Sequence, residues 1–423
     1  MMLQVIYRIV LSYVVLLLIF VGSLYVVNNI PTEMVRKNLE GSVAVIKHEG
    51  MYPSRGISWR KIVLDNFTDA IMLNVAYSVD SNDPLRSSIR TIQHDGDEKA
   101  EDQALNLEKI GQKSGVHETV YERYWHGYLI FLRPLLTIGS YAHVRVVWSI
   151  ALYILAGLVF VEMRKRVGIR AAFAFLIGLI AVDFFWIGES LQLSNVFMTG
   201  MIGSYILLKN QHWSFSSTLI FFFIMGGVTS YIDFLSAPLV GLSLLLFIAV
   251  ERIRGKLVQK VALLAFFWMV GYSSLWASKW FLAEFTYVRG AITSGYTKVE
   301  DRMMSPVDAE FSRVVAVKRN FLQFRGYDKR NKFALLYLGI GYSIFMLRYL
   351  TFRSARFERV IIFLGLGFLP YAWYFFAAEH SYIHVLFTYR NQLMTVISFF
   401  LLSCEFVHWE KLRKDCRIVA RKT

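Results

Sequence analysis

Apolar and polar residues alternate along this chain in long blocks, and the apolar blocks have the length needed to cross a lipid bilayer. A membrane-spanning helix needs about 20 mostly apolar residues. The first block ends in VNNIPTEM without a small-residue cleavage site, so we expect it to remain as a helix. Ten blocks qualify, at 8–28, 139–163, 169–188, 194–209, 214–233, 236–251, 259–280, 332–351, 357–378 and 385–405. This pattern predicts an all-α polytopic membrane protein with about ten transmembrane helices.

The polar blocks divide the chain into regions. The longest polar block follows the first apolar stretch, and we expect it to form a large extracytoplasmic loop carrying interfacial amphipathic helices. The predicted regions are a first transmembrane helix (1–28), an extracytoplasmic loop with juxtamembrane helices (29–138), transmembrane helices two to seven (139–280), a basic extracytoplasmic loop (281–331), transmembrane helices eight to ten (332–405) and a basic cytoplasmic tail (406–423).

The basic residues predict the orientation of these helices. Lys and Arg concentrate in every alternate connection, at 164–170, 209, 252–260, 348–359 and 411–422. Because cytoplasmic loops carry an excess of Lys and Arg, both termini are expected in the cytoplasm and the two long loops outside. The compact loops and the lack of a targeting feature favour a bacterial plasma membrane.

Composition supports the membrane assignment and limits the partners. The chain is 56% hydrophobic and 18% charged, whereas soluble domains carry about 25% charged residues. Its net charge of +15 does not indicate a nucleic acid partner, because the basic residues lie between apolar spans rather than on one soluble face. Long loops are exempt from the orientation rule, so the basic 281–331 loop either binds an anion or is simply solvated.

Two acids head a short apolar run, LDNFTDAIMLNVAY, at residues 64–77. Asp65 fits a helix N-cap, and Asp69 follows one turn later. We expect a short amphipathic helix on the membrane surface. A like charge one turn away raises the pKa of Asp69, which suits a general base. If the site is catalytic, we expect Asp65 to act as the orienting residue and Asp69 to react as the base. The alternative is that both acids only cap the helix.

Further candidates lie in two aromatic segments. YERYWHGYLIFLRPLL (121–136) is a second interfacial helix that carries Arg123, His126 and Arg133. Arg133 is a candidate for binding a donor phosphate and Arg123 a further site residue. His126 is more often a water-exposed interfacial histidine than a catalyst.

Polar residues at the predicted outer ends of late spans complete the candidate set. Asp233 lies in TSYIDFLSAP, where a carboxylate is either functional or held by a structural hydrogen bond. The segment AEHSYIHVLFTYRNQ adds a group of site candidates: Glu379, His380, His384, Tyr389 and Arg390. Arg390 needs an anionic partner, either a protein acid such as Asp233 or a phosphate held bidentately. His380 and His384 are expected beside that phosphate.

Cofactor motifs are missing from the sequence. There is no GxxxxGK[ST], GxGxxG, HExxH or GxSxG motif, so nucleotide-cofactor chemistry is not expected. Cys404 and Cys416 offer neither a disulfide framework nor a zinc motif. A divalent metal (Mg²⁺ or Mn²⁺) is compatible with Asp65 and Asp69, although two acids do not specify one.

The arrangement resembles the GT-C superfamily of integral-membrane glycosyltransferases, in an uncharacterised bacterial branch. DNFTD (65–69) and YERYWHGY in a large first outer loop carry the resemblance, together with SYIDFLSAP and EHSYIHVLFTYRN. The resemblance implies sugar transfer from a polyprenyl-phosphate carrier to an envelope glycan or glycolipid, with an Asp general base and inversion at the anomeric carbon. The acids lie far beyond the first span, which leaves open which Asp is the base.

Other functions remain open on sequence grounds. A transporter or flippase for a lipid-linked or anionic substrate would line its path with Asp233 and Arg390. An O-antigen polymerase or ligase type enzyme would carry its main outer loop late in the chain, whereas the longest loop here comes first. A scaffold without chemistry gives the outer acids no purpose.

Overall fold

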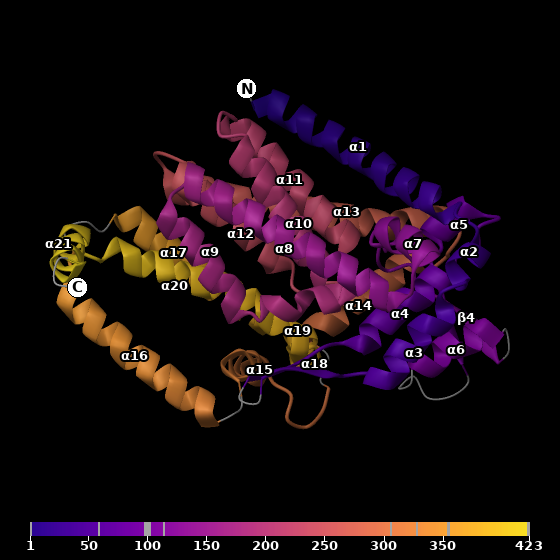
Figure 1. Cartoon of the computed structure of the whole chain (residues 1–423). Coiled ribbons are helices and arrows are strands. Elements are labelled where there is room, and N and C mark those ends of the chain that lie inside the picture. The colour runs from indigo at the N-terminus through magenta and orange to yellow at the C-terminus, as the bar shows by residue number, and fades with distance from the viewer. Residues whose placement is uncertain are drawn as a thin grey trace.

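The fold is almost entirely helical. The computed structural model describes residues 2–57, 60–96, 103–112, 115–304, 307–326, 329–352 and 356–420. Most of the long helices form one bundle, and most of the short helices and the strands gather at one end of it (Figure 1). We call this the loop end, defined by α2–α7, α14, α15 and α18. Both termini lie away from it (Figure 1).

Within the described residues, seven helical segments are long and apolar enough to cross a membrane. The chain is therefore a multi-pass membrane protein. The seven are α1 (Met2–Asn28), α8 (Tyr141–Arg166), α10 (Leu191–Lys209), α11 (Phe215–Ile232), α13 (Leu257–Thr286), α17 (Phe357–Phe376) and the broken segment Val385–Glu405, which contains α19 (Val385–Thr388), η2 (Tyr389–Gln392) and α20 (Leu393–Glu405).

The predicted count of ten spans is not confirmed, because three of the apolar blocks form helices that are not among these seven. The blocks at 169–188 and 236–251 give α9 (Ile169–Ala181) and α12 (Pro238–Arg252), with 13 and 15 residues. At 1.5 Å per residue both are shorter than the roughly 30 Å hydrocarbon core. Nearly every residue of α12 is buried, so it is an interior helix. The third block gives α16 (Lys329–Tyr349), which is not among the seven.

The first long polar region folds into short helices and two-stranded sheets on the loop end. α4 is buried on almost all sides, so it is not the lipid-facing surface helix that the sequence predicts. Two antiparallel pairs of strands are described: Ser54 pairs with Val63, and Ile92 pairs with Val120. The elements are α2 (Thr32–Arg36), α3 (Leu39–Glu49), β1 (Ser54–Ile57), β2 (Arg60–Val63), α4 (Asn66–Ser78), α5 (Pro84–Ile89), β3 (Ile92–Gly96), α6 (Gln103–Gln112), β4 (Val116–Val120) and α7 (Leu129–Ile138).

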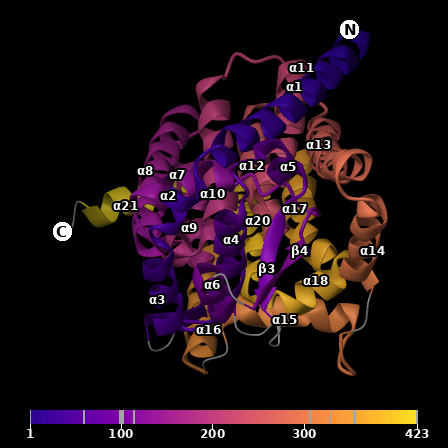
Figure 2. The ribbon, with the colours of Figure 1, turned by 90° about the vertical axis from the view of Figure 1, so that its right-hand side faces the viewer.

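The second long polar region covers the helix break that precedes α20. Figure 2 faces the loop end and shows α14 (Ala291–Met304) and α15 (Arg313–Arg325) beside α18 (Ala378–Ile383). Asn320 of α15 fixes this arrangement, because its amide nitrogen donates to the Ser381 carbonyl and its amide oxygen accepts from the Thr388 hydroxyl. The remaining described elements are η1 (Phe184–Glu189) and α21 (Trp409–Ala420).

Close helix contacts hold the bundle together. α11 and α13 meet through two glycines: a Cβ at Gly226 would lie 2.0 Å from the Trp268 carbonyl oxygen, and one at Gly271 would lie 2.0 Å from that of Phe223. One large apolar core joins α8–α13, α17 and α20, and a second joins α1 to the first polar region. The loop end is therefore firmly attached to the bundle.

Candidate functional site

Asp65 is the N-cap of α4, as the sequence predicts. Its Oδ1 accepts from the backbone N–H of Thr68 at 3.1 Å, and its Oδ2 accepts from the Thr68 hydroxyl at 2.7 Å. Burial raises the pKa of Asp65 despite these bonds. Both carboxylate oxygens therefore serve the start of the helix.

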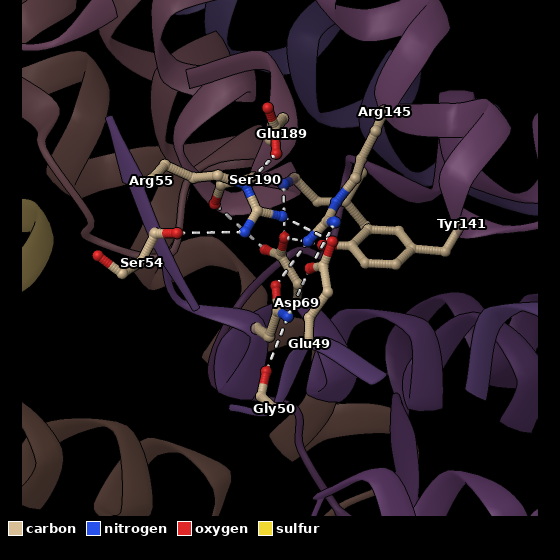
Figure 3. Close-up of polar contacts among 11 residues, drawn as sticks. Glu49, Gly50, Ser54, Arg55, Asp69, Tyr141, Arg145, Glu189 and Ser190 are labelled. Carbon is tan, nitrogen blue, oxygen red and sulfur yellow. Dashed lines mark hydrogen bonds and ion pairs between the residues drawn. The ribbon is translucent and has the colours of Figure 1, made fainter. Parts of the chain in front are cut away.

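Asp69 is fully buried and caps a different helix (Figure 3). Its Oδ2 accepts from the Leu191 N–H at 2.9 Å and from the Tyr141 hydroxyl, and its Oδ1 accepts from the Gln192 N–H at 3.0 Å and the Ser190 hydroxyl at 3.4 Å. Burial raises the pKa of Asp69 to about 6, against these donors. The side chain joins α4 to α10 and α8, and both oxygens already have protein donors.

An ion-pair network surrounds Asp69 (Figure 3). Glu49 accepts from Arg145 at 2.8 Å and from Arg55 at 2.6 Å, and Arg55 also pairs with Glu189 at 2.7 Å. Arg145 donates to the Asn66 amide oxygen at 2.6 Å. Burial alone would raise the pKa of Glu49, but the hydrogen bonds and charges of these partners lower it. Glu49, Arg55 and Arg145 were not predicted from the sequence, although Arg145, an arginine inside the 139–163 apolar block, was a usable signal.

Arg133 and His126, in the segment 121–136, both have partners within the protein. Arg133 is buried and donates to the carbonyls of Val27 (3.1 Å), Ala76 (2.5 Å) and Ile30 (2.6 Å). Each of its nitrogens is used, so it fastens backbone rather than facing a phosphate. His126 is fully buried, which corrects the expectation of a water-exposed histidine. Burial and nearby cations lower the pKa of His126 to about 3.

A second polar cluster forms where the 233–236 turn meets α18. Asp233 Oδ1 accepts from the Ser236 N–H at 3.0 Å. Its Oδ2 is buried and has no hydrogen-bond partner among the described residues. Burial raises the pKa of Asp233 to about 7. His380 lies 2.7 Å from the Leu235 carbonyl through Nε2, and no described residue bonds its buried Nδ1. The left-handed backbone of Leu235 (φ 65°) aims this carbonyl at His380.

Arg390 reaches the same end of the bundle from η2. It is fully buried, and its Nη1 donates to the Leu386 carbonyl at 2.7 Å. Its Nε and Nη2 have no acceptor in the described part of the chain. η2 packs on α12, which begins two residues after Ser236. The neighbouring Tyr389 donates to Asp183 at 2.9 Å, so Tyr389 positions η2.

Two cations of α14, Lys298 and Arg302, lie near His380 and His384. Arg302 of α14 pairs with Glu379 at 3.3 Å. The rings of His380 and His384 lie 4.8 Å apart. Burial and the charges of Arg302 and Lys298 lower the pKa of His384 to about 3, and burial, His384 and Arg302 lower that of His380. Both histidines are therefore neutral at physiological pH.

Arg123 approaches this cluster from the 121–128 segment. Its charge acts on Lys298 together with that of Arg302, and its carbonyl accepts from the indoles of Trp276 and Trp280. Arg123 thus lies near Lys298, whose charge acts on His380 and His384, and His380 contacts the turn that carries Asp233. The hydrogen bonds of Asp65, Asp69 and Arg133 all go to other parts of the fold.

The described residues contain no group of three or more His, Cys, Asp or Glu side chains that could hold a metal ion. Asp65 and Asp69 already accept from protein donors, so the predicted Mg²⁺ or Mn²⁺ site gains no support from their geometry.

Comparisons with known proteins do not add to this picture. No family model matches the chain, and no curated protein or solved structure matches it significantly. The chemistry of the site therefore rests on its own geometry.

Proposed function

We propose that the protein is a GT-C type membrane glycosyltransferase that moves a sugar from a polyprenyl-phosphate carrier to an envelope glycan or glycolipid. One observation carries the proposal: the cluster at the 233–236 turn and α18–η2 contains buried donors and acceptors that no described protein group satisfies. An unsatisfied buried polar group costs about 1–3 kcal/mol. Such groups are rare in native proteins, and several together favour a polar ligand.

The unpaired donors fit a phosphate. Arg390 offers Nε and Nη2, two adjacent N–H groups of the guanidinium fork, and Arg302 offers its Nε. A guanidinium binds phosphate oxygens bidentately. Neutral His380 and His384 leave the positive charge on these arginines and Lys298. The seven apolar segments place the protein in the membrane, where the tail of a lipid carrier also lies.

The unpaired acceptors fit sugar hydroxyls. Asp233 Oδ2 and His380 Nδ1 both accept, and both are held by the same 233–236 turn. Asn391 adds a buried amide whose oxygen and nitrogen have no partner among the residues described. A ligand with both phosphate and hydroxyl groups satisfies the donors and the acceptors together.

The reaction follows from these roles. Asp233 Oδ2 removes the proton from an acceptor hydroxyl, and the oxygen attacks the anomeric carbon. The bond from this carbon to the lipid phosphate oxygen breaks, and its electrons leave with the phosphate. Arg390 stabilises the charge that accumulates there. A single displacement inverts the anomeric carbon. A carboxyl with a pKa of about 7 suits a general base at neutral pH.

Asp233 is a better base than Asp69 on hydrogen-bonding grounds. Both oxygens of Asp69 accept from protein donors, whereas Asp233 keeps one oxygen without a described partner. The sequence-based choice of Asp69 stays a prediction, with Asp65 as its orienting neighbour, and the experiment below separates the two candidates.

The proposed location follows the charge pattern. The loop end would face the outside of a bacterial plasma membrane, with both termini in the cytoplasm. Nucleotide sugars are scarce outside the cell, so we expect the sugar donor there to be linked to a lipid.

A transfer assay tests the proposal. Purified protein in lipid nanodiscs is given radiolabelled sugar on polyprenyl phosphate together with envelope acceptors. We expect labelled product in the wild type, none with Asp233→Asn, and retained turnover per folded molecule with Asp69→Asn. Loss of turnover in folded Asp69→Asn alone would make Asp69 the base. Donor binding without bond cleavage in the wild type would instead indicate a flippase.

A further inference from the structure

A groove lies between α3 and α8, away from the Asp233–His380–Arg390 cluster. It has a volume of about 640 Å³. Ala44 and Val45 of α3 form one wall, and Val146 and Ile150 of α8 form part of the other. Val146 and Ile150 are 59% and 54% exposed on a membrane-spanning helix, so the groove opens towards lipid.

Part of the groove lining is polar, with His48, Glu49, Arg145, Ser149 and Glu189. Glu49, Arg145 and Glu189 belong to the network drawn in Figure 3. The Arg145 side chain is only 7% exposed, and its Nε has no acceptor among the residues that the structure describes. A buried N–H without a partner in the polar part of an apolar groove indicates a ligand with a polar head.

A second hollow lies farther along α8. This hollow has a volume of about 350 Å³ and is lined by apolar residues that include Ala156, Gly157 and Phe160. The lining residues of both hollows fall on one stripe of α8, at a spacing of three or four residues, and η1 borders both. The stripe could therefore accommodate a chain that runs from the polar part along the helix.

The charges in the polar part decide the kind of head group. Two cations, Arg55 and Arg145, are matched by two carboxylates, Glu49 and Glu189, and each cation is paired. A phosphate would meet both carboxylates without a free cation to compensate. The groups left for hydrogen bonding are one N–H donor, the Ser149 hydroxyl and the lone pairs of the carboxylates. This mixture of donors and acceptors suits hydroxyl groups.

We propose that this groove binds a membrane lipid with an uncharged sugar head group. The hydroxyls bond Arg145 Nε and the carboxylates of Glu49 and Glu189, and the hydrocarbon chain lies along α8. The use of this lipid as the sugar acceptor rests on the proposed function. Its binding does not, because the groove shares no residue with the Asp233 cluster.

Native mass spectrometry of the full-length protein in nanodiscs tests this inference. The probes are a diacylglycerol carrying one neutral hexose, phosphatidylglycerol and phosphatidylcholine, all with the same chains. We expect the hexose lipid to be retained at least tenfold more than either phospholipid. Equal retention of the three lipids, or a preference for phosphatidylglycerol, would overturn the proposal.

Variants locate the binding. Ala44→Trp fills the first hollow, and Gly157→Leu fills the second, because a Cβ at Gly157 meets no atom within 4 Å in the described structure. Gly22→Leu on α1 is the matched control, since its Cβ also meets open space there. Retention of the hexose lipid should fall at least fivefold in each groove variant and stay unchanged in Gly22→Leu. Unchanged retention in either groove variant would contradict the assignment. Asp233→Asn should bind this lipid normally, which separates this result from the transfer assay.

Discussion

The imidazole Nε2 of His380 lies 2.7 Å from the carbonyl oxygen of Leu235. A carbonyl only accepts, so Nε2 carries the proton and Nδ1 is left as an acceptor in the neutral ring. Asp233 Oδ2, on the same turn, is another acceptor without a described partner. Because one turn holds two buried acceptors, a ligand with hydroxyl groups would gain two hydrogen bonds here.

The pH dependence of turnover should report Asp233. Its pKa is raised above the usual value of 3.8 to about 7, so the carboxylate that acts as base forms as pH rises from about 6 to 8. We expect turnover to climb tenfold per pH unit below about pH 7 and to level off above it. Initial rates of sugar transfer between pH 5 and 9 measure this. A flat profile over that range would contradict Asp233 as the base.

The same shift affects stability with the opposite sign. The folded state holds the Asp233 proton more tightly than the unfolded state, so the stabilisation that this group gives is present at low pH. It is lost as pH rises from about 4 to 7. Thermal unfolding of Asp233→Asn should therefore show a weaker decline over this window than the wild type does.

Arg390→Gln should weaken donor binding without unfolding the protein. Two nitrogens of Arg390 have no acceptor within the described structure, so its removal breaks one hydrogen bond, to Leu386, and the contact with the Tyr389 ring. We expect donor affinity to fall at least tenfold, measured by titration with the lipid-linked sugar, with little change in melting temperature. Wild-type donor affinity would exclude the phosphate role.

Arg359→Gln is the matched control for a structural arginine. Arg359 is buried and pairs with Glu405 at 2.7 Å and with Glu251. Breaking a buried ion pair costs about 3–5 kcal/mol. This variant should lose melting temperature while its folded fraction keeps donor affinity.

Asp69→Asn should reduce stability more than Asp65→Asn does. Asp69 bonds donors on α8 and α10, so the amide leaves at least one buried donor without an acceptor, at about 1–3 kcal/mol. Asp65 bonds only Thr68 of its own helix, where an asparagine cap is tolerated. Melting curves of both variants in the same nanodiscs measure this. Equal melting temperatures would show that the Asp69 bonds to α10 contribute little.

Gly226→Ala and Gly271→Ala should each disrupt the contact of α11 with α13. An added Cβ would lie 2.0 Å from a carbonyl oxygen of the facing helix, which cannot rotate away. We expect a loss of about 3 kcal/mol or more, seen as poor recovery of folded protein by size-exclusion chromatography. Gly365→Ala on α17, whose Cβ meets no described atom within 4 Å, should behave like the wild type.

The hydrophobic pattern predicted most of the fold. Long apolar runs such as Leu3–Asn28 and Tyr141–Arg166 form helices wherever they are placed, because in lipid the backbone must satisfy its own hydrogen bonds. Local chemistry also predicted the cap of α4, since Asp65 bonds only three residues ahead. These features depend on neighbours in the chain, which a sequence displays directly.

Only the tertiary structure decided the partners of the charged residues. Asp69 and Asp233 are both acids beside apolar runs, yet Asp69 meets two amides 122 and 123 residues away, while Asp233 keeps one oxygen without a described partner. Likewise Arg133 donates hydrogen bonds to three carbonyls, whereas Arg390 donates to one. Whether a buried charge is satisfied depends on groups brought together from distant segments, and the linear pattern carries no record of those distances.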